Sequence, residues 1–572
     1  MTQLLRTNTK KTASSRIPDG ARASWFKAKA KRPLSLAQGR WIGDFGKLTA
    51  AECKLVRDCG RGVYCGFGEN CLEVEAFPSA TAHRDALFEQ VARPTGKQPN
   101  NTIRASLLRF LILGGDSDHP LHEGGVQLVG AWIEGELDLS VSQGAGYLGF
   151  YNCHFDSPVC LDYARLPLIV FTGSFMPQFS GVCLRLDGDA YLNEKFETTS
   201  GVNLFGACIG GSLLCNGAIL RCVDDDGKPS GIALDAALAQ ITGNVSLCQD
   251  FLATGEVRLV SAQIGGLLSL DNATLEGHVG GGLEFTGALN AEGVSVKGGL
   301  IVRKSSFNGI VNLLDAFASS LTDDQSSWPA SSLILDGFRY DRISFGSTDA
   351  VERCEWLRKQ QSGDLGVDFR PQPWEHLIKV LRDMGHPNQA KLVAIEKQRA
   401  LRRAGKIGPR PSRPKFDHGF DLAYNLQQAA DWIAFPADLF GSWIRRVGHI
   451  GYGFFSGYGH RAFRIVGLIF AVLAAFGFAY RYFGVESPAC LINGHSPSSC
   501  QDFWLPWRYS ADMILPLDFG LFDKGQPVAA SVGVHDPGDR QLVIFMSWVE
   551  TLFGWLFSGL LVAIAGRLVE RD

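Results

Sequence analysis

The segment GVNLFGACIGGSLLC at 201–215 decides the fold of this chain, because glycine and apolar residues alternate in it at the spacing of short β-strands. Related segments are GVQLVGAWIEGELDL (125–139), AALAQITGNVSLC (236–248), VRLVSAQIGGLLSL (257–270) and ALNAEGVSVKGGLIV (288–302). Aligning Ile133, Ile209, Ile241, Ile264 and Val296 places Gly135, Gly211, Gly243, Gly266 and Gly298 in one column. The last four repeats follow one another at 32, 23 and 32 residues, which is typical of a stack with occasional inserted loops.

This repeat explains why glycine supplies 66 of the 572 residues, since glycine suits the tight corners between short strands. We predict a mixed fold in which a right-handed β-solenoid, pentapeptide-repeat-like, covers 124–345. An α-helical cap precedes it, a helical hairpin follows it, and two transmembrane α-helices come last. A β-sandwich is the competing prediction for the repeat region.

Charge is distributed unevenly along the chain, although the net charge is only −3. The range 124–345 holds 24 acidic and 11 basic residues, so we predict an acidic stack. Such a surface would be repelled by an anionic membrane or would imitate nucleic acid towards a basic partner, and we favour repulsion. The range 1–45 is basic, has no apolar core of a signal peptide and is predicted to be a disordered tail.

Helical patterns lie on both sides of the repeats. We predict a helical N-terminal cap over 46–123, in which NTIRASLLRFLILGG (101–115) forms a helix that covers the first strands. The range 346–405 contains the hairpin, PQPWEHLIKVLRDMGHPNQAKLVAIEKQRALRRAG at 371–405, with its turn at Gly385 and Pro387.

A basic and amphipathic segment over 406–460 leads to the end of the chain, and the basic run starts just before it. Its aromatic part is DWIAFPADLFGSWI at 431–444. We predict that this segment lies on anionic lipid, and we disfavour nucleic acid because no nucleic-acid-binding fold surrounds it. The residues predicted to contact the membrane surface are Lys397, Arg399, Arg402, Arg403, Lys406, Arg410, Arg413 and Lys415.

Two apolar runs predict transmembrane helices at 465–485 and 546–566, with Glu550 near one membrane interface. Arginines flank the first helix on its N-terminal side and the second on its C-terminal side, which predicts that both termini, including the tail 567–572, lie in the cytoplasm. In a Gram-negative bacterium the chain would then be a multi-pass protein of the bacterial inner membrane. The loop 486–541 would then be periplasmic, where Cys490 and Cys500 are predicted to form a disulfide. Small residues on both helices leave homo-oligomerisation open.

The order of these segments resembles a bacterial family of pentapeptide-repeat-like membrane proteins that are often labelled membrane-associated oxidoreductases. The resemblance is carried by LTAAECKLVRDC, by NTIRASLLRFLILGGD running into GVQLVGAWIEGELDL, by PQPWEHLIKVLRDMGHPNQAKLV and by GWLFSGLLVAIAGRLVERD. It implies a cytoplasmic solenoid tethered to the inner membrane and implies no established reaction.

The sequence offers no strong chemical motif. Its glycine-rich pieces lie inside the strand repeat and not in a βαβ unit, and no cysteine pair has CxxC spacing. Cysteines recur every six residues at Cys53, Cys59, Cys65 and Cys71, which suits neither zinc nor an iron–sulfur cluster. The stretch GGDSDHPLHEGG (114–125) could hold a cation, but we favour a polar turn.

We therefore predict no catalytic residue, no cofactor and no metal. The predicted function is a membrane-anchored scaffold that binds an unidentified protein. The alternatives are an oxidoreductase, as the family label suggests, and an oligomeric two-helix channel. The GYG sequence at 457–459 resembles a potassium-channel filter but precedes the first predicted membrane helix, whereas a filter lies between two such helices.

Overall fold

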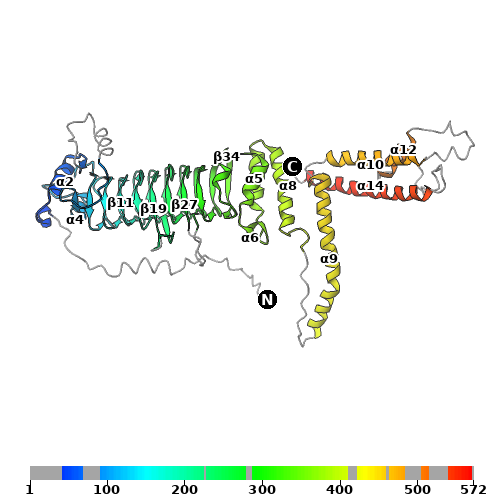
Figure 1. Ribbon diagram of the computed structural model, residues 1–572, viewed down its shortest axis with the longest axis horizontal. Coiled ribbons are helices and arrows are strands. Elements are labelled where there is room, and N and C mark those ends of the chain that lie inside the picture. The colour runs from blue at the N-terminus through cyan, green and yellow to red at the C-terminus, as the bar shows by residue number, and fades with distance from the viewer. Residues whose placement is uncertain are drawn as a thin grey trace, which may run out of the picture. The chain divides into compact units, whose positions relative to one another are not determined.

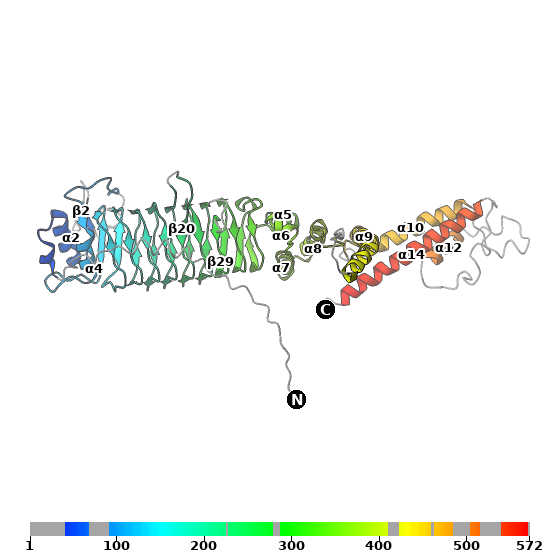
Figure 2. The ribbon, with the colours of Figure 1, turned by 90° about the horizontal axis from the view of Figure 1, so that it is seen from below.

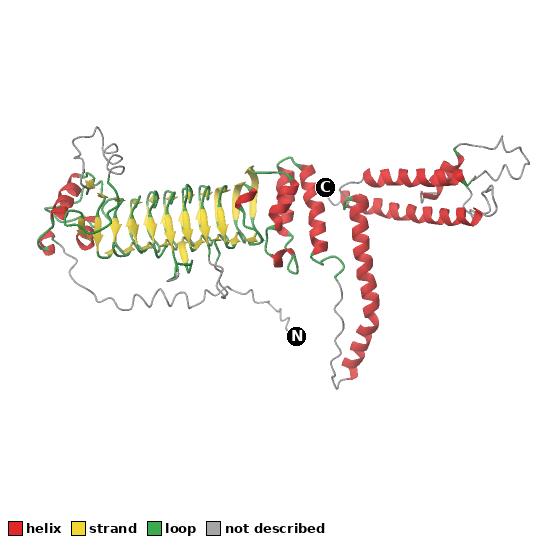
Figure 3. Cartoon of the chain, viewed as in Figure 1, coloured by secondary structure: helices red, strands yellow, loops and turns green. Residues whose placement is uncertain are grey.

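The computed structural model describes residues 41–67, 91–224, 227–277, 287–409, 422–458, 463–483, 504–514 and 539–569. The chain divides into two compact units, residues 1–177 and 178–572. Short parallel strands form large sheets in both, and long helices end the second unit (Figures 1 and 3). Most of the tail predicted for 1–45 lies outside the described residues.

The first unit combines helices with parallel strands. Its elements are η2 (Ile42–Phe45), α2 (Ala50–Arg61), β1 (Cys65–Gly66), β2 (Thr102–Arg104), α4 (Ala105–Ile112), β3 (Val126–Val129), β4 (Trp132–Glu134), β5 (Leu137–Asp138), β6 (Leu148–Tyr151), β7 (His154–Phe155), β8 (Val159–Cys160), β9 (Arg165–Leu166), β10 (Ile169–Val170) and β11 (Phe175–Met176). The strands pair in the orders β1-β3-β6-β10, β2-β4-β7-β11 and β5-β8.

The helix predicted over 101–115 is shorter than expected. Residues Thr102–Arg104 form β2, which pairs with β4, and α4 begins only at Ala105. The β-branched Thr102 and Ile103 suit a strand, and the Arg104 guanidinium is held by the carboxylate of Glu52, with Nε 2.6 Å from Oε1. This ion pair connects β2 to α2.

The second unit continues the pattern of two- to eight-residue strands. Its strands are β12 (Phe179–Ser180), β13 (Arg185–Leu186), β14 (Ala190–Tyr191), β15 (Glu197–Thr198), β16 (Val202–Asn203), β17 (Cys208–Ile209), β18 (Leu213–Leu214), β19 (Ile219–Arg221), β20 (Ile232–Asp235), β21 (Gln240–Ile241), β22 (Val245–Ser246), β23 (Leu252–Thr254), β24 (Glu256–Arg258), β25 (Gln263–Ile264), β26 (Leu268–Ser269), β27 (Thr274–Glu276), β28 (Leu289–Asn290), β29 (Ser295–Val302), β30 (Ser306–Asn308), β31 (Val311–Asn312), β32 (Phe317–Asp323), β33 (Leu333–Ile334) and β34 (Arg339–Phe345), with η4 at Gln325–Ser327.

Three parallel pairing orders organise these strands. The orders are β14-β18-β22-β26 and β13-β17-β21-β25, which meet at β29 and continue to β32 and β34; β15-β19-β23-β27-β30; and β12-β16-β20-β24-β28-β31-β33. The chain therefore visits the sheets in a fixed order, and its strands lie in a row from β20 to β29 (Figure 2).

The strand pairing confirms the predicted register for the last four repeats, because Ile209 pairs with Ile241, Ile241 with Ile264 and Ile264 with Val296. The alignment of the first repeat is wrong: Ile133 lies in β4, which belongs to a different sheet from β17. Strands of the different sheets carry a similar apolar spacing, so the sequence pattern does not distinguish one sheet from another. The 32-residue intervals contain the long connections from β19 to β20 and from β27 to β28.

The repeated glycines permit close approach between neighbouring repeats. Gly243 N donates to Gly211 O at 2.8 Å, and Gly266 N donates to Gly243 O at 2.8 Å. A Cβ atom on Gly243 would lie 2.9 Å from the carbonyl carbon of Gly211 and 2.4 Å from Ser212 Oγ. Glycine is therefore needed in this column because neighbouring repeats leave no room for a side chain. Two residues after each of these glycines, Leu213, Val245 and Leu268 pack in the core.

Helices cover the last strand and close the edge of its sheet. They are α5 (Ala350–Arg358), α6 (Ser362–Leu365), α7 (Gln372–Asp383) and α8 (Pro387–Arg403), and the last two occupy the range of the predicted hairpin. Gly337 N donates to Gln372 Oε1, and Tyr340 N donates to His376 Nε2, both at 2.9 Å. Burial lowers the pKa of His376, which favours the neutral ring that accepts this bond. Side chains of α7 therefore satisfy backbone groups that an edge strand would expose.

The described part of the chain after the hairpin contains the helices α9 (Leu422–Ser456), α10 (Phe463–Tyr482), α12 (Leu505–Ile514) and α14 (Arg540–Val569). Within the described residues, Arg464–Tyr482 of α10 and Gln541–Val562 of α14 are long and apolar enough to cross a membrane.

The glycine column generates a stability prediction. Gly243→Val should destabilise the surrounding strands by about 1–3 kcal/mol, because the new side chain must push neighbouring repeats apart. Hydrogen exchange of the peptides over 236–270 in the full chain should accelerate. Gly363→Ala is the matched control, since nothing lies within 4 Å of its added Cβ. Unchanged exchange in Gly243→Val would contradict this account of the column.

Candidate membrane-contact surface

A stripe of exposed apolar side chains runs along α9. We call it the α9 stripe, and it consists of Phe440, Trp443, Ile444, Val447, Ile450 and Phe454, which are 45–73% exposed. Steps of three and four residues place these side chains on one helix face, and the rings of Phe440 and Trp443 stack with centroids 6.1 Å apart. An exposed apolar helix face of this length is typical of a helix that lies in a membrane interface.

The middle of α9 is attached to the turn that follows α8. Ser442 Oγ and Arg446 Nε donate to the carbonyl of Gly408 at 3.0 and 2.8 Å. The first two residues of the GYG sequence form a turn directly after α9, in which Tyr458 has a positive φ of 58° and its buried ring lies 4.6 Å from that of His449. These two residues terminate a helix, and Gly459 lies outside the described residues.

The basic residues predicted to contact lipid differ in their surroundings. Lys397 pairs with Glu375, and Arg399 and Arg403 pair with Glu396. Arg402 is half-buried and Lys406 is exposed. Outside the described residues lie Arg410, Arg413 and Lys415, and also the proposed disulfide partners Cys490 and Cys500. Three of the predicted contacts are thus partly neutralised by carboxylates of the hairpin, which weakens their attraction to anionic lipid.

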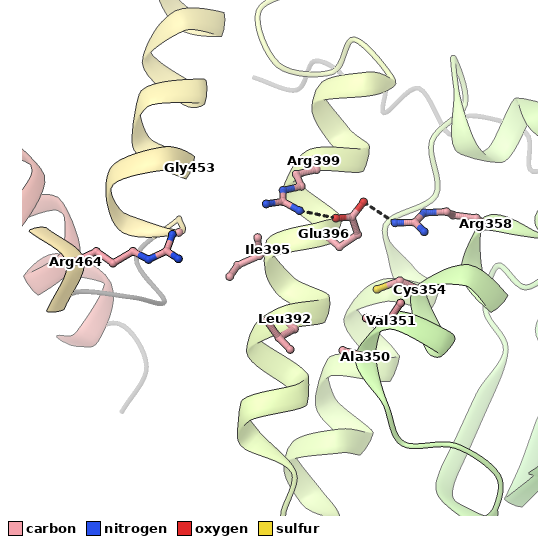
Figure 4. Close-up of a pocket in the computed structure, with 11 residues that line it drawn as sticks. Ala350, Val351, Cys354, Arg358, Leu392, Ile395, Glu396, Arg399, Gly453 and Arg464 are labelled. Carbon is pink, nitrogen blue, oxygen red and sulfur yellow. Dashed lines mark hydrogen bonds and ion pairs between the residues drawn. The ribbon is translucent and has the colours of Figure 1, made fainter.

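Glu396 is the centre of this charge cluster. Burial alone would raise its pKa, but hydrogen bonds and positive charge from Arg358, Arg399 and Arg403 lower it below the ordinary value. Arg358 Nη2 lies 2.8 Å from Glu396 Oε1 and so connects α5 to α8 (Figure 4).

A cavity of about 200 Å³ adjoins Glu396. Cys354 also lines it, and burial raises the pKa of this thiol to about 12, which leaves it protonated and unreactive. Burial likewise raises the pKa values of Cys59, Cys153 and Cys215 to about 12. These thiols are packing residues.

The polar turn at 114–125 is held together by Asp116. Its carboxylate accepts from Ile42 N at 2.9 Å and from His119 N at 2.8 Å. The hydrogen bond from Ile42 N lowers the pKa of Asp116 most. Among the described residues no group of three or more His, Cys, Asp or Glu side chains could hold a metal ion.

The structure adds two features that the sequence reasoning missed. One is α12, a ten-residue helix between α10 and α14 that packs against both.

The other is the burial of Glu550, the tenth residue of the span Gln541–Val562, whose carboxylate accepts from Tyr480 Oη at 2.8 Å. The expectation that Glu550 reaches water at an interface is therefore wrong, since α14 begins at Arg540 and places it in the middle of the helix. The polar side chains of Tyr509, Ser510 and Asp512 were the sequence feature that could have indicated polar packing between this segment and the long helices.

The acidic excess in 124–345 does not lie on the surface of the described residues. Of its described residues, nine carboxylates and nine basic side chains are exposed, so the surplus of acid is half-buried or buried. Asp189 accepts from Ser212 N at 2.6 Å and Asp235 from Ala237 N at 3.0 Å. Much of the surplus serves the corners between strands, where a carboxylate satisfies backbone donors.

Searches of protein-family models, curated proteins and solved structures found no match to this chain.

The α9 stripe generates a lipid-contact prediction. In proteoliposomes, the double substitution Phe440→Asp and Ile444→Asp should increase hydrogen exchange across 434–456 severalfold, because it removes apolar contacts with lipid. Val351→Asp is the control, since Val351 is 62% exposed on α5 and outside the stripe. If exchange of α9 is already unprotected in the unsubstituted chain, the stripe does not contact lipid.

Proposed function

We propose that this chain is a membrane-anchored scaffold of the bacterial inner membrane. In this proposal the parallel sheets are the sides of a right-handed β-solenoid, the chain crosses the membrane at α10 and α14, and both termini are cytoplasmic. The α9 stripe lies in the same leaflet that the solenoid faces. The fixed order in which the chain visits the sheets supports the solenoid, and the arginines at Arg445, Arg446 and Arg464 support the orientation.

The observation that carries the binding role is an exposed apolar pair on the second unit. Leu238 is 52% exposed and has a positive φ of 59°. Phe205, 37% exposed, belongs to the neighbouring repeat, because Gly206 N donates to Ala237 O at 2.8 Å. A leucine in left-handed backbone costs roughly 1–2 kcal/mol, and this one does not bury its side chain in return. A protein partner that covers Phe205 and Leu238 accounts for both features.

The first unit shows a second pair of this kind. Val141 and Tyr163 have positive φ values of 55° and 60° and are 81% and 61% exposed. Val141 N donates to Asp162 O at 2.8 Å, so the two residues lie in adjacent repeats. A β-branched valine is especially unfavourable at positive φ, which makes a purely structural role for Val141 a poor explanation. Apolar corners, more than acidic charge, therefore define the proposed binding surface.

The scaffold proposal predicts opposite effects of one substitution on stability and binding. Leu238→Gly should slow hydrogen exchange over 232–246 about fivefold, because relief of the strained backbone gains about 1 kcal/mol. It should also weaken partner binding. A photoreactive phenylalanine at position 205, activated in cells, should give a discrete protein adduct in the otherwise unsubstituted chain and much less in Leu238→Gly.

Gln249→Gly is the matched control for this experiment. Gln249 has a positive φ of 55° and is exposed, but its side chain is polar. It should gain stability without losing the adduct. Absence of any protein adduct at position 205 would argue against a partner on this surface, and loss of the adduct in both glycine variants would show that Leu238 has no specific role.

A further inference from the structure

We infer that the cavity beside Glu396 binds the phosphate of an anionic phospholipid from the cytoplasmic leaflet. This inference rests on the proposed membrane anchoring. Arg399 of α8 and Arg464 of α10 hold the phosphate from opposite sides, and the acyl chains stay outside the cavity. The ligand belongs to the class of phosphodiester lipids with a net negative charge, such as phosphatidylglycerol.

The cavity lies where the hairpin meets the long helices. It has a volume of about 200 Å³ and is lined by residues of α5, α8, the end of α9 and the start of α10. Figure 4 shows Arg399 extending toward it from α8 and Arg464 extending toward it from the opposite side. Pockets for drug-sized ligands measure about 300–1,000 Å³, so this cavity has room for a headgroup and not for a whole lipid.

Hydrogen bonds hold α8 and α9 on either side of the cavity. His449 Nε2 of α9 lies 3.4 Å from Oε1 of Gln398, the residue before Arg399. Ser442 Oγ of α9 donates to the carbonyl of Gly408, five residues after the end of α8, at 3.0 Å. These contacts place Arg399 beside the end of α9.

The cavity has a surplus of positive charge. Arg358, Arg399 and Arg464 line it. Among its described lining residues, Glu396 is the one carboxylate. This carboxylate pairs with Arg358, Arg399 and Arg403, so one negative charge serves three guanidinium groups. Arg464 adds a further positive charge to a cluster that is already positive.

The surroundings of Arg464 supply no carboxylate that would cancel this surplus. The range 439–485 contains no Asp or Glu. The Arg464 side chain is exposed and forms no ion pair within the part of the chain that the structure describes. Two guanidinium groups that extend toward one cavity repel each other, and a bound phosphate replaces this repulsion with two charge-assisted hydrogen bonds.

The position of the cavity favours a lipid over a soluble phosphate compound. Arg464 is the first residue of the apolar span Arg464–Tyr482, which places it at the level of the lipid headgroups. Gly453 lines the cavity and follows Ile450 by three residues, so it lies on the same side of α9 as part of the α9 stripe. Leu392, 39% exposed, adds an apolar edge on α8. Positive charge beside exposed apolar surface suits a phospholipid whose chains follow the stripe.

Native mass spectrometry of the full chain, purified in mild detergent and titrated with lipid, tests the site. We expect one phosphatidylglycerol to be retained about tenfold more strongly than phosphatidylcholine. The double substitution Arg399→Gln and Arg464→Gln should abolish this preference, because it removes both phosphate contacts. Equal retention of the two lipids by the unsubstituted chain, or an unchanged preference in the double variant, would overturn the site.

The matched control is the double substitution Lys406→Gln and Arg445→Gln. It also removes two positive charges, both exposed and close to the same helices, but neither residue lines the cavity. The preference for phosphatidylglycerol should therefore persist. Its loss in the control as well would reveal general attraction between basic residues and anionic lipid, and so would also count against a defined site.

Two further measurements separate the lipid from a soluble ligand and the site from the anchor. Glycerol 3-phosphate at the same concentration as the lipid should not release it, because this compound has no acyl chains to contact α9. Complete release would contradict the lipid assignment. Alkaline carbonate extraction of proteoliposomes checks insertion: inserted protein without a lipid preference contradicts the site and leaves the anchor intact, whereas extracted protein contradicts the anchor itself.

Discussion

The close approach of backbone between successive repeats is the constraint on which the rest of the second unit depends. Parallel hydrogen bonds join Gly211 to Gly243 and Gly243 to Gly266, and no side chain fits between them. Once this spacing is fixed, Leu213, Val245 and Leu268 meet in the core. Neighbouring repeats pair through parallel strands, so the strands at the ends of each sheet need protection.

Protection at the ends and corners explains residues that would otherwise suggest chemistry. Gln372 and His376 hydrogen-bond to the backbone beside β34, and Asp189 satisfies a backbone donor between strands. Asp116 does the same in its turn. Most of these polar groups stabilise the backbone and are therefore not candidates for binding a partner. Exposed apolar residues in strained backbone, such as Leu238, are the better candidates.

Much of the fold could be predicted from the sequence, because period-two alternation and glycine spacing report directly on strand register. Ile209, Ile241 and Ile264 pair as predicted. The sheet to which Ile133 belongs could not be predicted, since similar apolar spacing recurs in the strands of each sheet. The α9 stripe was recognised in part from its aromatic residues. The position of α12 could not be predicted, because a short polar helix lacks the long apolar run of a membrane span. Its position depends on hydrogen bonds to Leu473 and Glu550, which the sequence does not show.

Electron cryomicroscopy of the full chain in a lipid nanodisc tests the central claim most directly. The account predicts parallel strands in which Gly211, Gly243 and Gly266 stack on one another, α9 at the disc surface and α12 inside the disc between α10 and α14. Antiparallel strands in the repeat region, or a density for α10 and α14 that lies outside the lipid, would contradict it.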